Sequence, residues 1–189
     1  MKPYKSLYIG LLLMFLFNSC NENTPQLVNE DELITTVEVT LKSNLQTILL
    51  KSIDLDGNGP AKQVISVSEP LAKNTVYTGS IRFLNESVQP YVNISEEVLA
   101  EAEAHQVFFQ APAAFGTFVY DDIDANGKPL GLEFTLTTGS SDTTGDLSVI
   151  LIHEPNKSNP GVSDGSITNA GGSRDVDVVF PIAISIILN

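Results

Sequence analysis

The chain has 189 residues, with 23 acidic and 10 basic side chains that give it a formal net charge of −13 at pH 7. A surface this acidic repels the phosphate backbone of nucleic acids, so nucleic-acid binding is excluded as a function. The length suits one domain with a sizeable hydrophobic core, and we expect residues 32–189 to form that single domain.

The first 19 residues have the layout of a cleavable export signal. A basic start, Met1 to Lys5, precedes an apolar run from Leu7 to Phe17 that is too short to span a bilayer. Ser19 and Cys20 follow, and a small residue directly before a cysteine resembles the bacterial lipobox. That resemblance implies that the Cys20 thiol is acylated and that cleavage makes Cys20 the first residue of the mature chain.

Cys20 is the only cysteine, so the chain forms no internal disulfide. Several acyl chains, palmitate among them, would anchor it stably in a membrane. The polar stretch of residues 20–31 has the composition of a tether. Asn21 differs from the aspartate that retains some lipoproteins at the inner membrane. We therefore expect an outer-membrane location. The domain could face either the periplasm or the outside of the cell.

The rest of the chain predicts mainly β-strands. Leu33 to Lys42 alternates between apolar and polar side chains, which is typical of a half-buried strand. Further strands are predicted at residues 45–55, 63–68, 75–84, 107–110, 115–120, 132–138, 147–153 and 176–188. The two strands on either side of Gly139 to Gly145 are expected to form a hairpin, and Pro181 indicates an edge or a bulge in the last strand.

One stretch, Ser95 to His105, predicts a helix. The Ser95 hydroxyl suits the N-cap position, where it would accept a hydrogen bond from a first-turn amide. Val98, Leu99 and Ala102 are expected to face the core, with His105 one turn further along the same stripe. Eight or nine short strands with one inserted helix predict an antiparallel two-sheet sandwich of the immunoglobulin-like kind, with a small barrel as the alternative.

The sharpest motif is a match to the twelve-residue calcium loop. Asp122, Asp124 and Asn126 supply oxygens at positions one, three and five, Gly127 stands at position six, and Glu133 closes the loop at position twelve. The flanking residues predict strands, so the loop is not an EF-hand proper. A calcium site is one interpretation of this loop, and a plain turn is the other, because aspartate, asparagine and glycine also favour turns.

The two histidines are a second candidate site. His105 has Glu101 and Glu103 near it in the sequence, and His153 precedes Glu154. If the fold brings the histidines together, two imidazoles and a carboxylate could hold zinc or another transition metal. The alternative is a structural role, in which each histidine hydrogen-bonds a carbonyl at the end of an element.

Enzyme motifs are missing from the sequence. It contains no Gly-x-Ser-x-Gly elbow, no phosphate loop and no His-Glu-x-x-His pair. We therefore expect a non-catalytic protein. The long stretch of residues 154–173, rich in Gly, Asn, Ser and Pro, is a candidate contact surface for a partner, and the alternative, which we prefer, is a flexible loop without a function of its own.

Four runs of the sequence, at residues 32–37, 84–87, 103–109 and 153–157, resemble a family of small envelope lipoproteins of Bacteroidota. Some members of that family are labelled as a type 1 periplasmic binding fold. This strand-rich chain does not support that label, because the fold alternates strands and helices over a much longer sequence. The resemblance implies a lipid-anchored envelope protein that is an accessory to an outer-membrane uptake receptor. It supplies no catalytic residues.

These observations lead to one expectation with two alternatives. We expect a non-catalytic, lipid-anchored outer-membrane protein that binds a cation such as calcium, a small ligand or a partner protein. The first alternative is a lipoprotein that captures a transition metal through His105 and His153. The second is a structural or adhesive module of the envelope.

Overall fold

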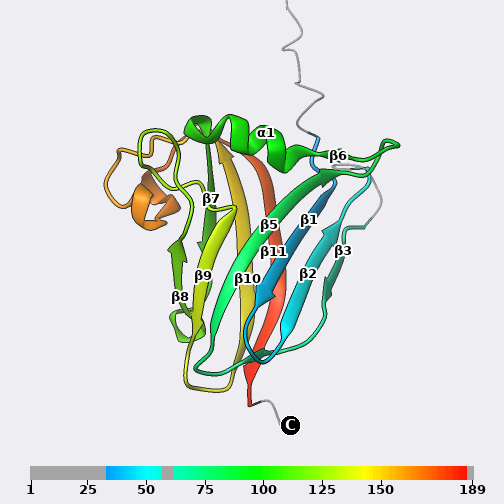
Figure 1. Ribbon diagram of the computed structural model, residues 1–189, viewed down its shortest axis with the longest axis vertical. Helices are drawn as coiled ribbons and strands as arrows, with labels where there is room; N and C mark the ends of the chain where they lie inside the picture. Colours follow the sequence, from blue (N-terminus) through cyan, green and yellow to red (C-terminus); the bar gives the residue numbers. More distant parts are fainter. Residues whose placement is uncertain (1–32, 57–61, 187–189) are drawn as a thin grey trace, which may run out of the picture.

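The computed structural model describes residues 33–56 and 62–186, so the export signal, Cys20 and the tether lie outside the described residues. The described strands form two sheets that pack face to face (Figure 1). Their pairing is mostly antiparallel, and one short helix is inserted between strands. The predicted mainly β, two-sheet sandwich is therefore confirmed.

The larger sheet has seven strands, in the order β3-β2-β1-β5-β9-β8, with β6 paired to β5. Its members are β1 (Thr36–Lys42), β2 (Thr47–Ile53), β3 (Val64–Val67), β5 (Val76–Asn85), β6 (Val92–Asn93), β8 (Gly116–Tyr120) and β9 (Glu133–Thr138). The alternation in β1 has the predicted consequence, because Val37, Val39 and Leu41 are all buried. The face that carries them packs against the second sheet.

The smaller sheet has four strands in the order β4-β11-β10-β7. They are β4 (Leu71–Ala72), β11 (Ser173–Ser185), β10 (Thr143–His153) and β7 (His105–Gln110). The predicted hairpin between β9 and β10 is wrong, because the two strands belong to different sheets. Their apolar alternation is correct, since Phe134 and Leu147 are both buried in the core, but alternation does not say which sheet a strand joins.

Strand β10 buries apolar side chains on both of its faces. Val149 and Leu151 belong to the core between the sheets, whereas Ile150 and Ile152 belong to a second cluster on the outer face. The segment after β10 covers this second cluster with two short 3-10 helices, η4 (Val162–Asp164) and η5 (Ile167–Asn169). The long loop predicted at residues 154–173 is thus a packed cover for the smaller sheet.

The helix α1 (Ile94–Ala100) lies across one end of the sandwich, and the 3-10 helix η2 (Ala102–Ala104) follows it (Figure 1). Two predictions about this helix are wrong. Asn93 is the N-cap residue, and the Ser95 hydroxyl instead accepts a hydrogen bond from the Phe83 backbone N–H at 2.7 Å. Leu99 is 58% exposed. None of the helices in the described part of the chain has the length and apolar character needed to cross a bilayer.

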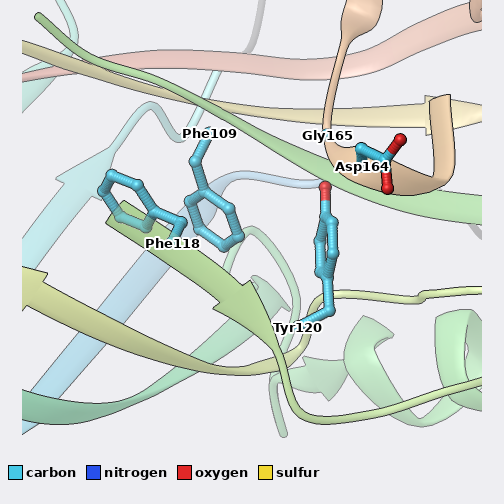
Figure 2. Close-up of a pocket in the computed structure, with 5 residues that line it drawn as sticks. All are labelled: Phe109, Phe118, Tyr120, Asp164 and Gly165. Atoms are coloured by element: carbon cyan, nitrogen blue, oxygen red, sulfur yellow. The ribbon is translucent and has the colours of Figure 1, made fainter. Parts of the chain in front are cut away.

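One side of the sandwich is hollowed where β7 and β8, the end strands of the two sheets, approach the segment after β10 (Figure 2). Phe109 on β7 stacks on Phe118 of β8, with ring centroids 4.9 Å apart and ring planes 6° apart. These two rings, with Tyr120, Asp164 and Gly165, line a cavity of about 170 Å³. This aromatic cavity is separate from the histidine site described next.

Candidate metal centre

The two histidines meet because of the strand register. Strands β7 and β10 are antiparallel neighbours, and their pairing sets His105 directly opposite His153. Side chains of directly opposed residues point to the same face of a sheet. The two imidazole rings accordingly stack, with centroids 4.8 Å apart and planes 17° apart. His153 follows the buried alternation of Leu151, so the pair lies at the end of the core between the sheets.

A β-bulge brings a carboxylate to the histidine pair. In the pairing of β10 with β11, Leu151 faces Val176 and Ile152 faces Arg174, so Asp175 is the extra residue of the bulge. An extra residue of this kind changes the direction of its side chain relative to regular alternation. Without the bulge, alternation would place Asp175 on the same face as the exposed Asp177.

The three side chains are close enough to share one ion. One ligand atom from each of His105, His153 and Asp175 lies within 4.8 Å of the other two. His105 Nε2 is 3.9 Å from Asp175 Oδ2, which is longer than a hydrogen bond. A zinc ion about 2.1 Å from each ligand atom would hold those atoms about 3.4 Å apart at tetrahedral angles. Small side-chain rotations would therefore complete the site.

The outer contact of His105 suits a metal ligand. Its Nδ1 lies 3.1 Å from the backbone carbonyl oxygen of Glu101, just after α1. An imidazole that donates its Nδ1–H to a carbonyl presents Nε2 as the electron-pair donor, which is how metal-binding histidines are commonly held. The same contact also fits the structural role that the sequence left open, so the hydrogen bond alone does not distinguish the two.

Asp175 connects the histidine pair to a cavity between the sheets. This cavity measures about 300 Å³, and its lining includes Asp54, Asp56, Asp175 and Asp177. Carboxylates that line a hollow concentrate cations there by their combined field. This acidic cavity shares Asp175 with the group of three side chains, so an ion that enters it meets one ligand of that group.

The sequence missed Asp175. It suggested Glu101, Glu103 or Glu154 as the carboxylate, whereas the structure places Asp175 at the histidines and Glu101 contributes only its backbone carbonyl. No local pattern announces the bulge. The prediction that His105 ends the helix is also wrong, because the helix stops at Ala100 and His105 is the first residue of β7.

The predicted calcium loop has a different geometry. Both oxygens of Asp122 accept backbone hydrogen bonds, from the N–H groups of Gly131, Leu132 and Glu133 at 2.6–3.0 Å. The side chains of Asn126 and Glu133 are exposed. The calcium site stays a prediction, and the contacts present within the loop are those of a turn closed by its own amides.

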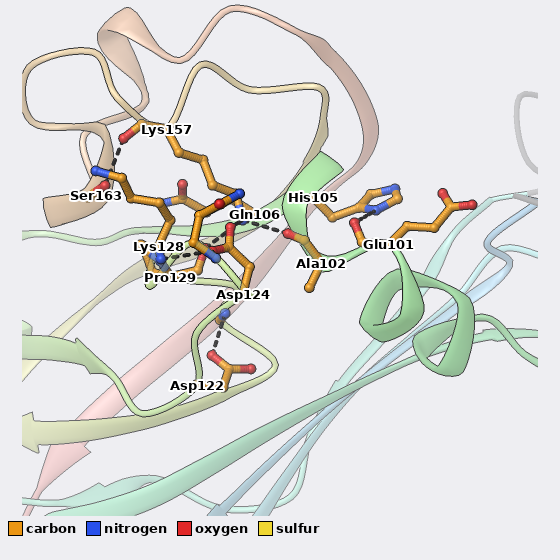
Figure 3. Close-up of polar contacts among 12 residues, drawn as sticks. Glu101, Ala102, His105, Gln106, Asp122, Asp124, Lys128, Pro129, Lys157 and Ser163 are labelled. Atoms are coloured by element: carbon orange, nitrogen blue, oxygen red, sulfur yellow. Dashed lines mark hydrogen bonds and ion pairs between the residues drawn. The ribbon is translucent and has the colours of Figure 1, made fainter.

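An internal ammonium group supplies positive charge to this loop. Lys157 Nζ donates hydrogen bonds to Asp124 Oδ2 at 3.0 Å and to the carbonyls of Ala102 and Pro129 at 2.6 and 2.9 Å (Figure 3). The other Asp124 oxygen accepts two backbone amides, one of them from Lys128. We call Lys157 and its three oxygen partners the lysine clasp. No pattern in the sequence indicates this clasp, because Lys157 lies in a segment predicted to be a surface loop.

The clasp shifts the pKa of both charged partners. Burial alone would raise the pKa of Asp124, but the amide of Lys128 and the ammonium of Lys157 outweigh it and hold that pKa below its usual range. Burial lowers the pKa of Lys157, and the hydrogen bond to Asp124 offsets part of that effect. The ionised pair is therefore maintained by contacts that replace the water lost on burial.

Compared with family models, curated proteins and solved structures, the chain shows no match. The resemblance to envelope lipoproteins of Bacteroidota thus stays a prediction.

Proposed function

We propose that this protein is a lipid-anchored lipoprotein of the bacterial envelope that captures a transition-metal ion. The ion would be held by His105 Nε2, by one ring nitrogen of His153 and by a carboxylate oxygen of Asp175. The observation that carries the proposal is the mutual distance of these three ligand atoms, none of which is more than 4.8 Å from another. We call these residues the histidine cluster.

The ligand set favours zinc, copper or nickel over calcium. Imidazole nitrogen suits these borderline metals, whereas calcium takes six to eight oxygen ligands. The cluster offers two nitrogens and one carboxylate. For this reason we expect the cation at the histidine cluster, the first alternative from the sequence, and not at the loop of Asp122 and Asp124.

Three protein ligands leave a fourth tetrahedral position for water or for a ligand from another molecule. A site with an exchangeable position suits uptake and release better than permanent structural binding. The acidic cavity beside Asp175 would gather cations at the approach to the cluster. Together these features support capture of a metal and its transfer to a receptor in the same membrane.

The test is titration of the purified protein with zinc by calorimetry, and with cobalt(II) by visible absorption. Cobalt(II) reports its geometry, because tetrahedral sites absorb much more strongly than octahedral ones. We expect one ion per chain and a tetrahedral spectrum. His153→Gln and Asp175→Asn should each weaken binding by at least about 10-fold, since loss of even an outer partner of a metal ligand costs roughly 10- to 100-fold.

Asp177→Asn is the matched control, because Asp177 lines the same cavity on the same strand but does not belong to the cluster. It should leave the affinity within about 2-fold of the original, allowing for a small field effect. Circular dichroism would verify that each variant is folded. Absence of binding, or zinc binding that survives His153→Gln, would refute the proposal and leave the histidine pair with its structural role.

A further inference from the structure

The aromatic cavity has walls made of ring surfaces. Phe109 and Phe118 form one side of it, and Tyr120 stands between them and Asp164 in Figure 2. Phe118 and Tyr120 are two residues apart on β8, so they project from the same face of the strand. A volume of about 170 Å³ admits a group of several heavy atoms, since one water molecule takes up about 30 Å³ of the liquid.

A buried glutamine fixes two sides of the cavity relative to each other. Gln106 is fully buried, and its Nε2 donates hydrogen bonds to the Tyr120 hydroxyl at 3.3 Å and to the Val162 carbonyl at 2.8 Å. Tyr120 in turn donates to the Val107 carbonyl at 2.7 Å. Val162 begins the short helix η4, which ends at Asp164. The Tyr120 ring and the backbone at the start of η4 are thus held in place before any ligand arrives, which lowers the entropy cost of binding.

The charge at the cavity is negative. Asp164 lies at its rim and is exposed, and no hydrogen bond or ion pair links its carboxylate to another residue within 33–56 or 62–186. The lining residues include no lysine, arginine or histidine. An anion would therefore meet repulsion here, whereas a cation would find one full opposite charge.

We infer that the aromatic cavity binds a small organic cation, namely an ammonium, quaternary ammonium or guanidinium group. A cation is attracted to the negative face of an aromatic ring, and cages of several rings are a known means of recognising quaternary ammonium groups. The cavity combines three rings with one carboxylate, so the ring surfaces would surround the apolar part of the ligand while Asp164 balances its charge.

This site is distinct from the histidine cluster. Phe109 and His105 are four residues apart on the same strand, which corresponds to about 13 Å along β7. Neither Phe118 nor Tyr120 belongs to the metal centre. The inference therefore does not depend on the proposed metal function, and each can fail without the other.

The test uses choline and its neutral carbon analogue, 3,3-dimethyl-1-butanol, which has nearly the same shape without the charge. Both are titrated into the purified protein, and binding is followed by ligand-observed NMR. We expect choline to bind and the alcohol to bind at least about 5-fold more weakly. Phe118→Leu should weaken choline binding by about 2- to 5-fold, the range for cation–π contacts at accessible sites. Asp164→Asn should weaken it by about 2- to 5-fold as well, through loss of an exposed opposite charge.

Asp146→Asn provides the matched control, because Asp146 is an exposed carboxylate on β10 that does not line the cavity. It should not change the affinity for choline. Equal binding of choline and the alcohol would overturn the inference by showing a merely apolar hollow. Absence of choline binding, or choline binding unaffected by both Asp164→Asn and Phe118→Leu, would overturn it as well.

Discussion

The lysine clasp and the histidine cluster both gather polar groups at the margin of the sandwich core, yet they differ in where positive charge comes from. In the clasp, the ammonium of Lys157 faces Asp124 and two carbonyls within the fold. In the cluster, the Asp175 carboxylate stands beside two imidazoles, and under the proposed function the positive charge would come from a bound metal ion. The calcium-loop motif around Asp124 is thus neutralised by a lysine of the protein itself. The histidine cluster, which suits a metal ion, matches no sequence motif.

The largest expected effect breaks the clasp. Lys157→Met would leave the buried Asp124 carboxylate without its counter-ion, and the carbonyls of Ala102 and Pro129 without a donor. Loss of one partner of a buried pair typically costs about 3–5 kcal/mol, and we expect the unfolding free energy in urea to fall by that amount. Lys128→Met, at a partly exposed position on the turn that contains Asp124, should change the unfolding free energy by less than about 0.5 kcal/mol.

A second substitution, at Gly172, should disturb the histidine cluster by displacing the backbone of His153. Gly172 has a φ of +70°, and a Cβ there would lie 2.2 Å from the carbonyl oxygen of His153. Gly172→Ala should lower the unfolding free energy by about 2–4 kcal/mol, because overpacking adds to left-handed strain. Zinc affinity should fall with it, since the backbone that carries His153 must move.

The neighbouring glycine offers the control for that change. Gly171 has a φ of +65°, and a Cβ there would meet nothing within 4 Å. Gly171→Ala should therefore cost only the backbone strain, about 1 kcal/mol, and leave zinc affinity unchanged. Equal effects of the two substitutions on zinc affinity would contradict the close contact between Gly172 and His153.

Low pH tests the contribution of the Asp124 charge to the lysine clasp. Because the fold holds the pKa of Asp124 below its ordinary value of about 3.9, its contribution to stability is present above about pH 4 and is lost as the pH falls through the lowered pKa. The difference in unfolding free energy between the original protein and Asp124→Asn should therefore shrink between pH 6 and pH 3. A constant difference over that range would show that the Lys157 contact does not depend on the Asp124 charge.

The smallest expected effect concerns Glu133, at the end of the predicted calcium loop. Burial, followed by the charges of Asp122 and Asp121, raises the pKa of Glu133, so its ionised form costs stability at neutral pH. Glu133→Gln should raise the free energy of unfolding at pH 7 by a few tenths of a kcal/mol, seen as a slightly higher melting temperature, and the gain should vanish at low pH. Glu69→Gln, at an exposed position, should leave melting unchanged.

Alternation made most of the strands predictable. The buried residues of β1 and β11 follow the period of two that the sequence shows, because one face of each strand packs against the opposite sheet. Pro181 also fits its predicted place, since β4 pairs with β11 only at Ile184 and Ser185, which leaves the rest of that side of β11 as an edge within the described residues. The pairing of distant strands was not predictable, as the separated strands β9 and β10 show.

The candidate site was predictable only in part. His105 and His153 were identified as residues that could share an ion, but the sequence could not show that β7 and β10 are neighbours in register. Asp175 was not predicted because its position depends on a bulge. A bulge arises where one strand has an extra residue relative to the strand that it pairs with. Lys157 escaped notice because its partners are mostly backbone carbonyls, which every sequence contains.

The lysine clasp also has a consequence for how the molecule opens. Its ammonium joins the segment after α1, the turn that contains Asp124 and the segment that covers the smaller sheet, three regions far apart in the sequence. Detachment of the segment that carries Lys157 breaks all three contacts at once, so we expect these regions to open together as one cooperative unit. Lys157 is the only buried lysine among the described residues, and its rate of labelling by an amine-reactive reagent would time that opening directly.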